Sequence, residues 1–311
     1  MRQLAIAEQM LGQGHEVSLL SNMAGPQWLE EYVGHQAGLG LIQVAEGCFE
    51  PDVILRPILD ALLIDSYQVS QSDIIALEER GVRVALMIDG PWQDISGNIA
   101  IAPVLDGDAA WLQEPRRNFK QFHFGPSFIP LRQEITRRKN TLSSRGKAAG
   151  TRRVVISLGG NATRLEELIL SAVLRTSHPC HFDVFFEPNK QMWAAAEQSS
   201  HTLRAHARGS AFLDLVAQSD VVIAAAGSSA AELLYLGIPT MFVPIAANQS
   251  ENAESITRLN LGPVLWPSSL GFEVTLQRTL SDNLGDSPKV ATLQRIIDGQ
   301  GSARIANVLA S

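Results

Sequence analysis

The chain has 311 residues, of which 45% are hydrophobic, and this length and composition are typical of a globular protein with two domains. Its formal net charge of −7 argues against nucleic acid as a partner, because a phosphate backbone is bound by a basic face. The sequence contains no stretch as long as a transmembrane helix, and the opening MRQLAIAEQM lacks the apolar core of a signal peptide. We therefore expect a cytoplasmic protein.

Cysteine and histidine usage gives no support for a disulfide framework or a metal site. Cys48 and Cys180 lie far apart, and neither belongs to a CxxC pattern. One cluster has metal-ligand chemistry, His178-Pro179-Cys180-His181, but a second cluster with matching spacing is missing. We expect a polar turn at this position and no metal.

The opening residues predict a helix followed by a strand. Apolar residues recur at helical spacing over residues 2–11, Gly12 to Gly14 ends the helix, and Val17 to Leu20 has strand composition. This order is unusual, because a doubly wound α/β domain normally opens on a central strand whose following turn carries a ligand site.

Two apolar runs in the first half end on acids. Ala61 to Ile64 precedes Asp65-Ser66-Tyr67, and Val82 to Ile88 precedes Asp89-Gly90. Parallel strands end at one edge of a sheet, so these carboxylates are candidates for a general base there. Each acid could instead cap the turn that follows, and for Asp89 we prefer this alternative, because Gly90-Pro91 is ordinary turn chemistry.

The second half begins with a strand at Val154 to Ser157, followed by the glycine turn Leu158-Gly159-Gly160-Asn161 and a helix. Basic and small polar residues before it indicate a linker. We therefore predict an N-terminal domain over residues 1–135, a linker over 136–152 and a nucleotide-binding domain over 153–311. The apolar spacing between Lys289 and Leu309 predicts a helix packed on the body of the protein.

The most informative stretch runs from Asp220 to Asn252. A buried strand at Val221 to Ile223 stops at Gly227-Ser228-Ser229, and a short helix over Ala230 to Leu236 leads to a strand at Met241 to Ile245. Free backbone N–H groups at the start of this helix suit a phosphate or diphosphate.

The same residues have a purely structural alternative. Ser229 and Glu232 have the spacing of a capping box, and Gly227 could serve only a tight turn. The polar cluster from Asn248 to Asn252 favours a ligand site, because it follows the next strand and so emerges at the same sheet edge.

The segment AAGSSAAELLYLGIPTMFVPIAANQSENA resembles the C-terminal nucleotide-sugar motif of the GT-B superfamily. It is most similar to the UDP-sugar hydrolase of the pseudaminic-acid pathway and its spore-coat polysaccharide relatives, and more distantly resembles the lipid-II-forming N-acetylglucosaminyltransferase. The resemblance implies three sets of contacts: the diphosphate with Gly227, Ser228 and Ser229, the ribose with Glu232, and the sugar with Asn248, Gln249 and Asn252.

Three other segments carry the same resemblance. Asp65-Ser66-Tyr67 resembles the D-x-Y segment of these hydrolases, which makes Asp65 and Tyr67 expected active-site residues. Gly159, Gly160 and Asn161 fall on their S-x-G-G segment, which faces the cleft between domains. FGPSFIPLRQEI resembles their domain-junction segment, with Phe128 and Arg132 on its aromatic and arginine positions.

The opening segment resembles the first helix and second strand of the hydrolases, beginning just after their G-x-G-H turn. In that family the turn's histidine is the proposed general base. Gly12-Gln13-Gly14-His15 has the same letters but follows a helix and opens a strand, so we expect His15 to be a turn residue at the opposite sheet edge. No residue then inherits the base role, and the first helix should lie beside a sheet whose central position is vacant.

The resemblance implies two Rossmann-like domains facing a cleft, with the first strand of the N-terminal domain missing. The expected reaction is hydrolysis of a UDP-linked amino sugar at its anomeric carbon, with no cofactor or metal. One alternative is a glycosyltransferase that uses a UDP-sugar. Another is an inactive nucleotide-sugar-binding protein, or a gene whose true start lies upstream.

Overall fold

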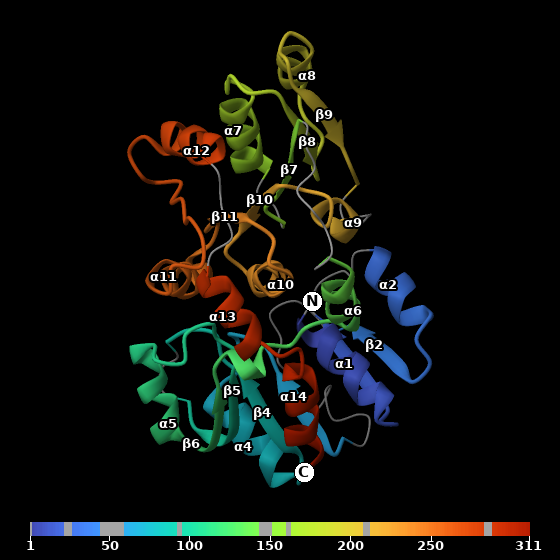
Figure 1. Ribbon diagram of the computed structural model, residues 1–311. Helices are drawn as coiled ribbons and strands as arrows, with labels where there is room; N and C mark the ends of the chain where they lie inside the picture. The colour runs from blue at the N-terminus through green and yellow to red at the C-terminus, as the bar shows by residue number, and fades with distance from the viewer. Residues whose placement is uncertain are drawn as a thin grey trace. The chain divides into compact units, whose positions relative to one another are not determined.

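The computed structural model describes residues 2–21, 27–43, 59–91, 95–142, 151–159, 163–207, 212–282 and 288–311. The chain divides into two compact units: unit 1 contains Met1–Thr136 and Ile296–Ser311, and unit 2 contains Arg137–Arg295. Each unit is built on parallel strands with helices packed against them (Figure 1). No helix in the described part of the chain is long and apolar enough to cross a membrane.

Unit 1 contains two separate parallel sheets. The small sheet pairs β1 (Val17–Ser21) with β2 (Leu39–Gln43). The larger sheet has the order β3-β4-β5-β6, with β3 at Ala61–Ile64, β4 at Arg83–Met87, β5 at Gly97–Ala102 and β6 at Phe119–Phe124. The helices are α1 (Arg2–Gly12), α2 (Gln27–Gly34), α4 (Gln71–Glu79), α5 (Pro115–Asn118) and α14 (Gly301–Ala310), with 3-10 turns η1 (Ala110–Gln113) and η2 (Pro126–Phe128).

Helix α1 packs against both sheets of unit 1. Its Ile6 belongs to an apolar cluster with Ile101 of β5, whereas its Ala7 packs with Leu39 of β2. Among the described residues, β1 pairs only with β2 and β3 only with β4, so no strand joins the two sheets. Helix α1 thus lies beside the larger sheet, as predicted, and the vacant central position stays a prediction.

The C-terminal helix belongs to unit 1, whereas the sequence suggested that it packs with the nucleotide-binding domain. Ile305 and Leu309 of α14 are buried in the cluster that contains Ile6 of α1. Arg304 Nη1 also donates to the Ser127 carbonyl at 2.9 Å. The residues that make these contacts lie far apart in the sequence. Apolar spacing therefore predicted the helix but did not indicate the sheet on which it packs.

Unit 2 contains one parallel sheet with the order β11-β10-β7-β8-β9. Its strands are β7 (Arg152–Ser157), β8 (Cys180–Val184), β9 (Thr202–Ala205), β10 (Val221–Ala225) and β11 (Thr240–Val243). Its helices are α7 (Thr163–Val173), α8 (Lys190–Glu197), α9 (Phe212–Val216), α10 (Ser229–Leu236), α11 (Ser250–Arg258), α12 (Phe272–Ser281) and α13 (Pro288–Ile296), with the 3-10 turn η3 (Ala247–Gln249).

Helix α6 (Gln133–Leu142) occupies the start of the segment that the sequence assigned to a linker. The boundary between the units falls within this helix, between Thr136 and Arg137. The basic composition that indicated a solvated linker is compatible with a helix that is mostly polar. Residues 143–150, the middle of the predicted linker, lie outside the described part of the chain.

The strand order of unit 2 reverses between β7 and β10. After β7 the chain adds β8 and β9 on one side, then returns so that β10 pairs with β7 on the other, with Ile223 opposite Ile156. Both faces of these strands are covered, which is why they read as continuous apolar runs. In open parallel sheets such a reversal is the usual place for a ligand, at the carboxyl ends of the strands.

Candidate functional site

The turn between β10 and α10 is the glycine turn singled out in the sequence. Strand β10 ends at Ala225 and helix α10 begins at Ser229, so Ser229 is the first helical residue. The N-cap is Ser228, whose side chain makes no capping hydrogen bond. The alternative of a capping box between Ser229 and Glu232 is therefore wrong, because that motif needs Ser229 as the N-cap and the helix begins one residue earlier than this.

The start of α10 offers backbone donors. Ala230 N–H bonds to the Gly227 carbonyl at 3.0 Å, but the N–H groups of Gly227, Ser228 and Ser229 have no partner among the described residues. These groups lie at the positive end of the helix dipole. The arrangement is suited to an anion with several oxygen atoms, such as a phosphate or diphosphate.

The polar loop after β11 contacts this turn directly, as the sequence predicted for two loops at one sheet edge. Asn252 Nδ2 donates to the carbonyls of Ala226 at 2.7 Å and Gly227 at 3.3 Å. Gln249 Oε1 accepts the N–H of Ile245 at 3.0 Å. A Cβ placed on Gly227 would lie 3.2 Å from Gln249 Nε2. Asn252 therefore holds the turn in place, whereas Gln249 braces its own loop and lies next to Gly227.

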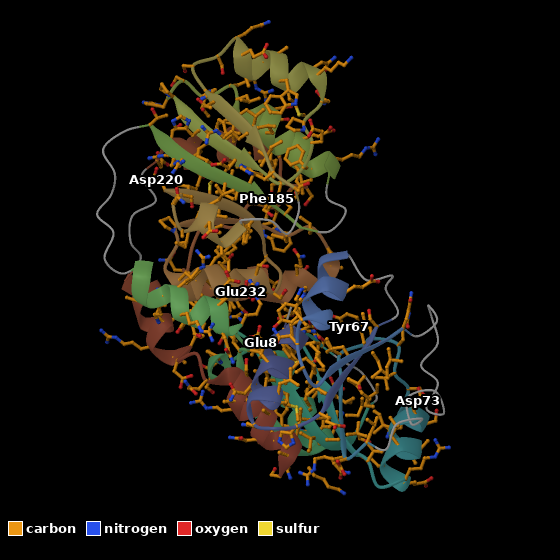
Figure 2. All side chains as sticks on the ribbon, turned by 90° about the vertical axis from the view of Figure 1, so that its right-hand side faces the viewer. Glu8, Tyr67, Asp73, Phe185, Asp220 and Glu232 are labelled. Carbon is orange, nitrogen blue, oxygen red and sulfur yellow. The ribbon has the colours of Figure 1, made fainter. Side chains whose placement is uncertain are left out.

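The remaining predicted residues of this site differ in exposure. Glu232, labelled in Figure 2, is the fourth residue of α10. It is only 8% exposed, whereas Asn248 is exposed. A carboxylate this deep in a helix start is usually held by specific hydrogen bonds, since burying an unpaired charge is costly. Both residues belong to the same strand-edge region as the turn.

The second glycine turn follows β7, next to β10 in the sheet. Ser157 lies opposite Ala224 in the register, so the turns after β7 and β10 flank the reversal of strand order. Gly159 is exposed and has a φ of 68°, a left-handed conformation that favours glycine. Gly160 and Asn161 lie outside the described residues.

A buried acid that the sequence analysis did not single out holds this second turn. Glu166 is the fourth residue of α7 and is fully buried, and its Oε1 accepts the N–H of Leu158 at 3.1 Å. Glu232 has the corresponding position in α10. The glycine turns that follow β7 and β10 are thus each followed by a helix with a buried glutamate at its fourth residue, a spacing that comparison of the two segments could have revealed.

Unit 1 links Asp65 to Tyr67 through Arg2 and Asp89, of which the sequence analysis did not single out Arg2. Arg2 Nε donates to Asp65 Oδ2 at 2.6 Å, its Nη2 contacts Oδ1 of the same carboxylate, and its Nη1 reaches Asp89 Oδ2 at 3.0 Å. Gln3 Nε2 also donates to Asp65 Oδ2, at 2.9 Å. Tyr67, which is 62% exposed, donates its hydroxyl to Asp89 Oδ1 at 2.6 Å.

The ion pairs keep Asp65 ionised. Burial acts to raise the pKa of Asp65, but the hydrogen bonds and positive charge of Arg2 outweigh it and hold this pKa below its ordinary value. Burial likewise opposes the charged form of Arg2, and the bonds with Asp65 and Asp89 nevertheless raise its pKa. Asp65 is therefore a fixed negative charge and a weak proton acceptor. The preference for Asp89 as a simple turn residue was wrong, because its carboxylate bonds Arg2 and Tyr67.

Two other sequence features have structural roles. His15 lies exposed in the turn between α1 and β1, as predicted. The N–H of Cys180 donates to Nδ1 of buried His201, and His201 Nε2 lies 3.1 Å from the Thr176 carbonyl, so His201 carries its proton on Nε2. The described residues contain no group of three or more His, Cys, Asp or Glu side chains arranged to hold a metal ion.

Comparison with known proteins identifies the fold. No protein-family model matches the sequence, and a search of curated proteins finds no match. Acinetobacter baumannii MurG aligns over 99% of this chain and 95% of its own, at 15% identity and a TM-score of 0.65. The glycotransferase of kitacinnamycin aligns over 99% and 94%, at 15% identity and a TM-score of 0.66. Arabidopsis thaliana UGT89C1 complexed with UDP-L-rhamnose aligns over 99% and 94%, at 14% identity and a TM-score of 0.67.

The chain has the GT-B fold of these glycosyltransferases, as the sequence resemblance implied. The structural similarity extends over nearly the full length of each protein, so both units share in it. It does not support the narrower assignment to UDP-sugar hydrolases of the pseudaminic-acid pathway, because the similar structures are glycosyltransferases.

Proposed function

We propose that the protein transfers a sugar from a UDP-sugar donor, and that it binds the donor's diphosphate at the start of α10. The observation that carries this proposal is the set of N–H groups of Gly227, Ser228 and Ser229, which have no partner among the described residues, beside the reversal of strand order. The choice of UDP as the nucleotide is supported by similar structures complexed with UDP and with UDP-L-rhamnose.

The position of α10 suits the chemistry of the leaving group. When the bond between the anomeric carbon and the diphosphate breaks, negative charge develops on the departing phosphate oxygen. Preorganised N–H groups and the positive end of a helix dipole stabilise that charge more in the transition state than in the ground state. The N–H groups of Gly227, Ser228 and Ser229 would act in this way, in a turn held by the amide of Asn252.

Other residues are assigned to the donor by their place around the turn. We assign Glu232 to the ribose and Asn248 to the sugar. Gln249 and Asn252 are also assigned to the sugar, through the amide atoms other than Gln249 Oε1 and Asn252 Nδ2, which already bond to backbone groups. Gly159, Gly160 and Asn161 belong to the second glycine turn at the same sheet edge and are the remaining candidates for donor contacts. Their assignment rests on the sequence resemblance and on the strand order.

Asp65 and Tyr67 are proposed for the reaction from unit 1. Because Asp65 is held as a carboxylate by Arg2, it suits orientation of an acceptor hydroxyl or stabilisation of positive charge better than removal of a proton from water. This argument and the glycosyltransferases that share the fold both support transfer over hydrolysis. Measuring UDP release from UDP-sugars with and without sugar acceptors separates the two: transfer requires acceptor for most of the release, whereas hydrolysis does not.

The diphosphate assignment is tested by replacing Gly227 with valine. The new side chain would occupy the space in front of the N–H groups and press on Gln249 Nε2, 3.2 Å from the Cβ position. We expect Gly227→Val to weaken UDP binding at least tenfold, measured by isothermal titration calorimetry on protein whose circular dichroism is unchanged.

Gly34→Val is the matched control, because a Cβ at Gly34 meets nothing within 4 Å and the residue lies in unit 1. It should leave UDP affinity unchanged. Equal UDP affinity in folded Gly227→Val and in the unmodified protein would remove the start of α10 from the site.

A further inference from the structure

The other end of α10 is held by side chains from outside the helix. Gly237 ends the helix in a left-handed conformation, with φ 73°, and its N–H bonds to the Leu234 carbonyl at 3.0 Å. Gln294 Nε2 donates to the Tyr235 carbonyl at 2.9 Å and approaches the Leu234 carbonyl at 3.4 Å. Gln294, a residue of α13, thus supplies a donor to the Tyr235 carbonyl in the last turn of α10, where the carbonyl groups have no partner further along the helix.

Lys139 of α6 completes this contact. Its Nζ lies 3.9 Å from the centre of the Tyr235 ring and donates to the backbone carbonyl of Gln294 at 3.3 Å. A cation near the carboxyl end of a helix is favoured by the helix dipole, and a cation above an aromatic ring by its quadrupole. Burial lowers the pKa of Lys139, so placing the ammonium group here has a cost that these contacts offset.

The contact leaves little freedom for the residues involved. Tyr235 is only 6% exposed, and a Cβ on Gly237 would lie 2.6 Å from Gln294 Nε2. Helix α10 has eight residues and is therefore roughly 12 Å long, a short rigid element. We expect a helix this short to move as one body, so that a shift of its first turn reaches the side chains that hold its last turn.

The residues that hold α10 lie beside the two points where the chain passes between units. The chain enters unit 2 between Thr136 and Arg137, within the same helix as Lys139, and leaves it after Arg295, directly beyond Gln294. Both connections are thus fixed to the carboxyl end of one helix. The amino end of that helix is the site proposed for the diphosphate.

We propose that Lys139 and Gln294 are positioning residues which couple nucleotide binding at the start of α10 to the two connections between the units. The inference rests on the proposed binding of UDP at that helix. UDP orders the first turn of α10, and the ordered helix strengthens its contacts with α6 and α13. By linkage, the same contacts strengthen UDP binding by the same factor.

Hydrogen exchange with and without saturating UDP tests the coupling. In the unmodified protein, UDP should slow amide exchange several-fold in residues 137–142 and 288–295 as well as in α10. In the double variant Lys139→Met, Gln294→Met, the slowing outside α10 should disappear and UDP affinity should fall about fivefold, the low end of usual coupling factors. Lys139→Arg, which keeps the cation above Tyr235, should retain more of the effect than Lys139→Met.

Arg138→Met is the matched control, because Arg138 is the neighbour of Lys139 in α6 but pairs with Asp214 of α9 at 2.6 Å. It should leave the exchange response and UDP affinity unchanged. If UDP binds the unmodified protein without altering exchange in α6 and α13, or binds the folded double variant equally well, the coupling is overturned and the proposed function stands. If UDP does not bind the unmodified protein, both fail.

Discussion

Gly301, the first residue of α14, has less room than any other glycine the structure describes. A Cβ built on it would lie 2.1 Å from the Ile129 carbonyl oxygen and 2.9 Å from the Ile129 nitrogen. Because these are backbone atoms, they cannot turn aside as a flexible side chain would. Gly301→Ala should push α14 off its site and lower the free energy of unfolding by about 1–3 kcal/mol, measured by urea denaturation.

Gly12→Ala provides the comparison at the same scale. Gly12 ends α1 in the same unit, and a Cβ there meets nothing within 4 Å. The change should be small, within about 1 kcal/mol, and stabilising if helix propensity dominates. A stability loss at Gly12 as large as that at Gly301 would show that close packing against Ile129 is not the cause.

Helix α1 is the element that joins the carboxyl ends of β3 and β4, through Arg2. The pKa of Asp65 is below its ordinary value in the folded protein, so the stabilising pair is fully formed above that ordinary value, near 3.8, and is lost as pH falls through the lower folded value. Arg2→Met should therefore lower the free energy of unfolding by about 1–3 kcal/mol at neutral pH. The difference from the unmodified protein should shrink as pH falls below 3.8.

Urea titrations at a series of pH values between neutral and acidic measure this dependence. The Arg175–Glu273 pair offers a control, because its side chains are 56% and 41% exposed. Arg175→Met should cost less than about 1 kcal/mol, as expected for a solvated ion pair. A loss with Arg2→Met that stays constant down to strongly acidic pH would contradict the role of Asp65.

The division into two units governs the behaviour of the whole molecule. Helix α14 closes the chain on unit 1, where Ile305 and Leu309 cover the same sheet face as Ile6 of α1. Deleting residues 301–311 should expose this apolar cluster and unfold unit 1 selectively. Unit 2, which contains none of the deleted residues, should retain its sheet and bind UDP.

Limited proteolysis followed by mass spectrometry, with calorimetric titration of UDP, measures both results in one preparation. Cleavage should concentrate in unit 1 of the deletion variant, and UDP should protect only unit 2. Ser311→Ala is the control, because this substitution leaves the buried face of α14 intact. Loss of both units together would show that unit 2 depends on unit 1 for its fold.

Much of the fold could be predicted because its signals are local. The β-branched run at Val221 to Ile223 and the glycine at position 237 predicted β10 and the end of α10, and both agree with the structure. Parallel pairing followed from strand and helix alternation, since parallel strands require long crossovers. The approach of Asn252 and Gln249 to the turn at Gly227 followed from the same topology.

The sequence by itself thus determined the α/β class, the main strands and the glycine turn, because each depends on residues close together in the chain. Only the tertiary structure decided that Arg2 bonds both Asp65 and Asp89, which lie 63 and 87 positions after it in the chain. It also decided that α14 belongs to unit 1. Ion pairs and apolar faces do not specify their partners by local pattern, because any complementary group of the chain can satisfy them. The partner is selected when the strands of a sheet take their places.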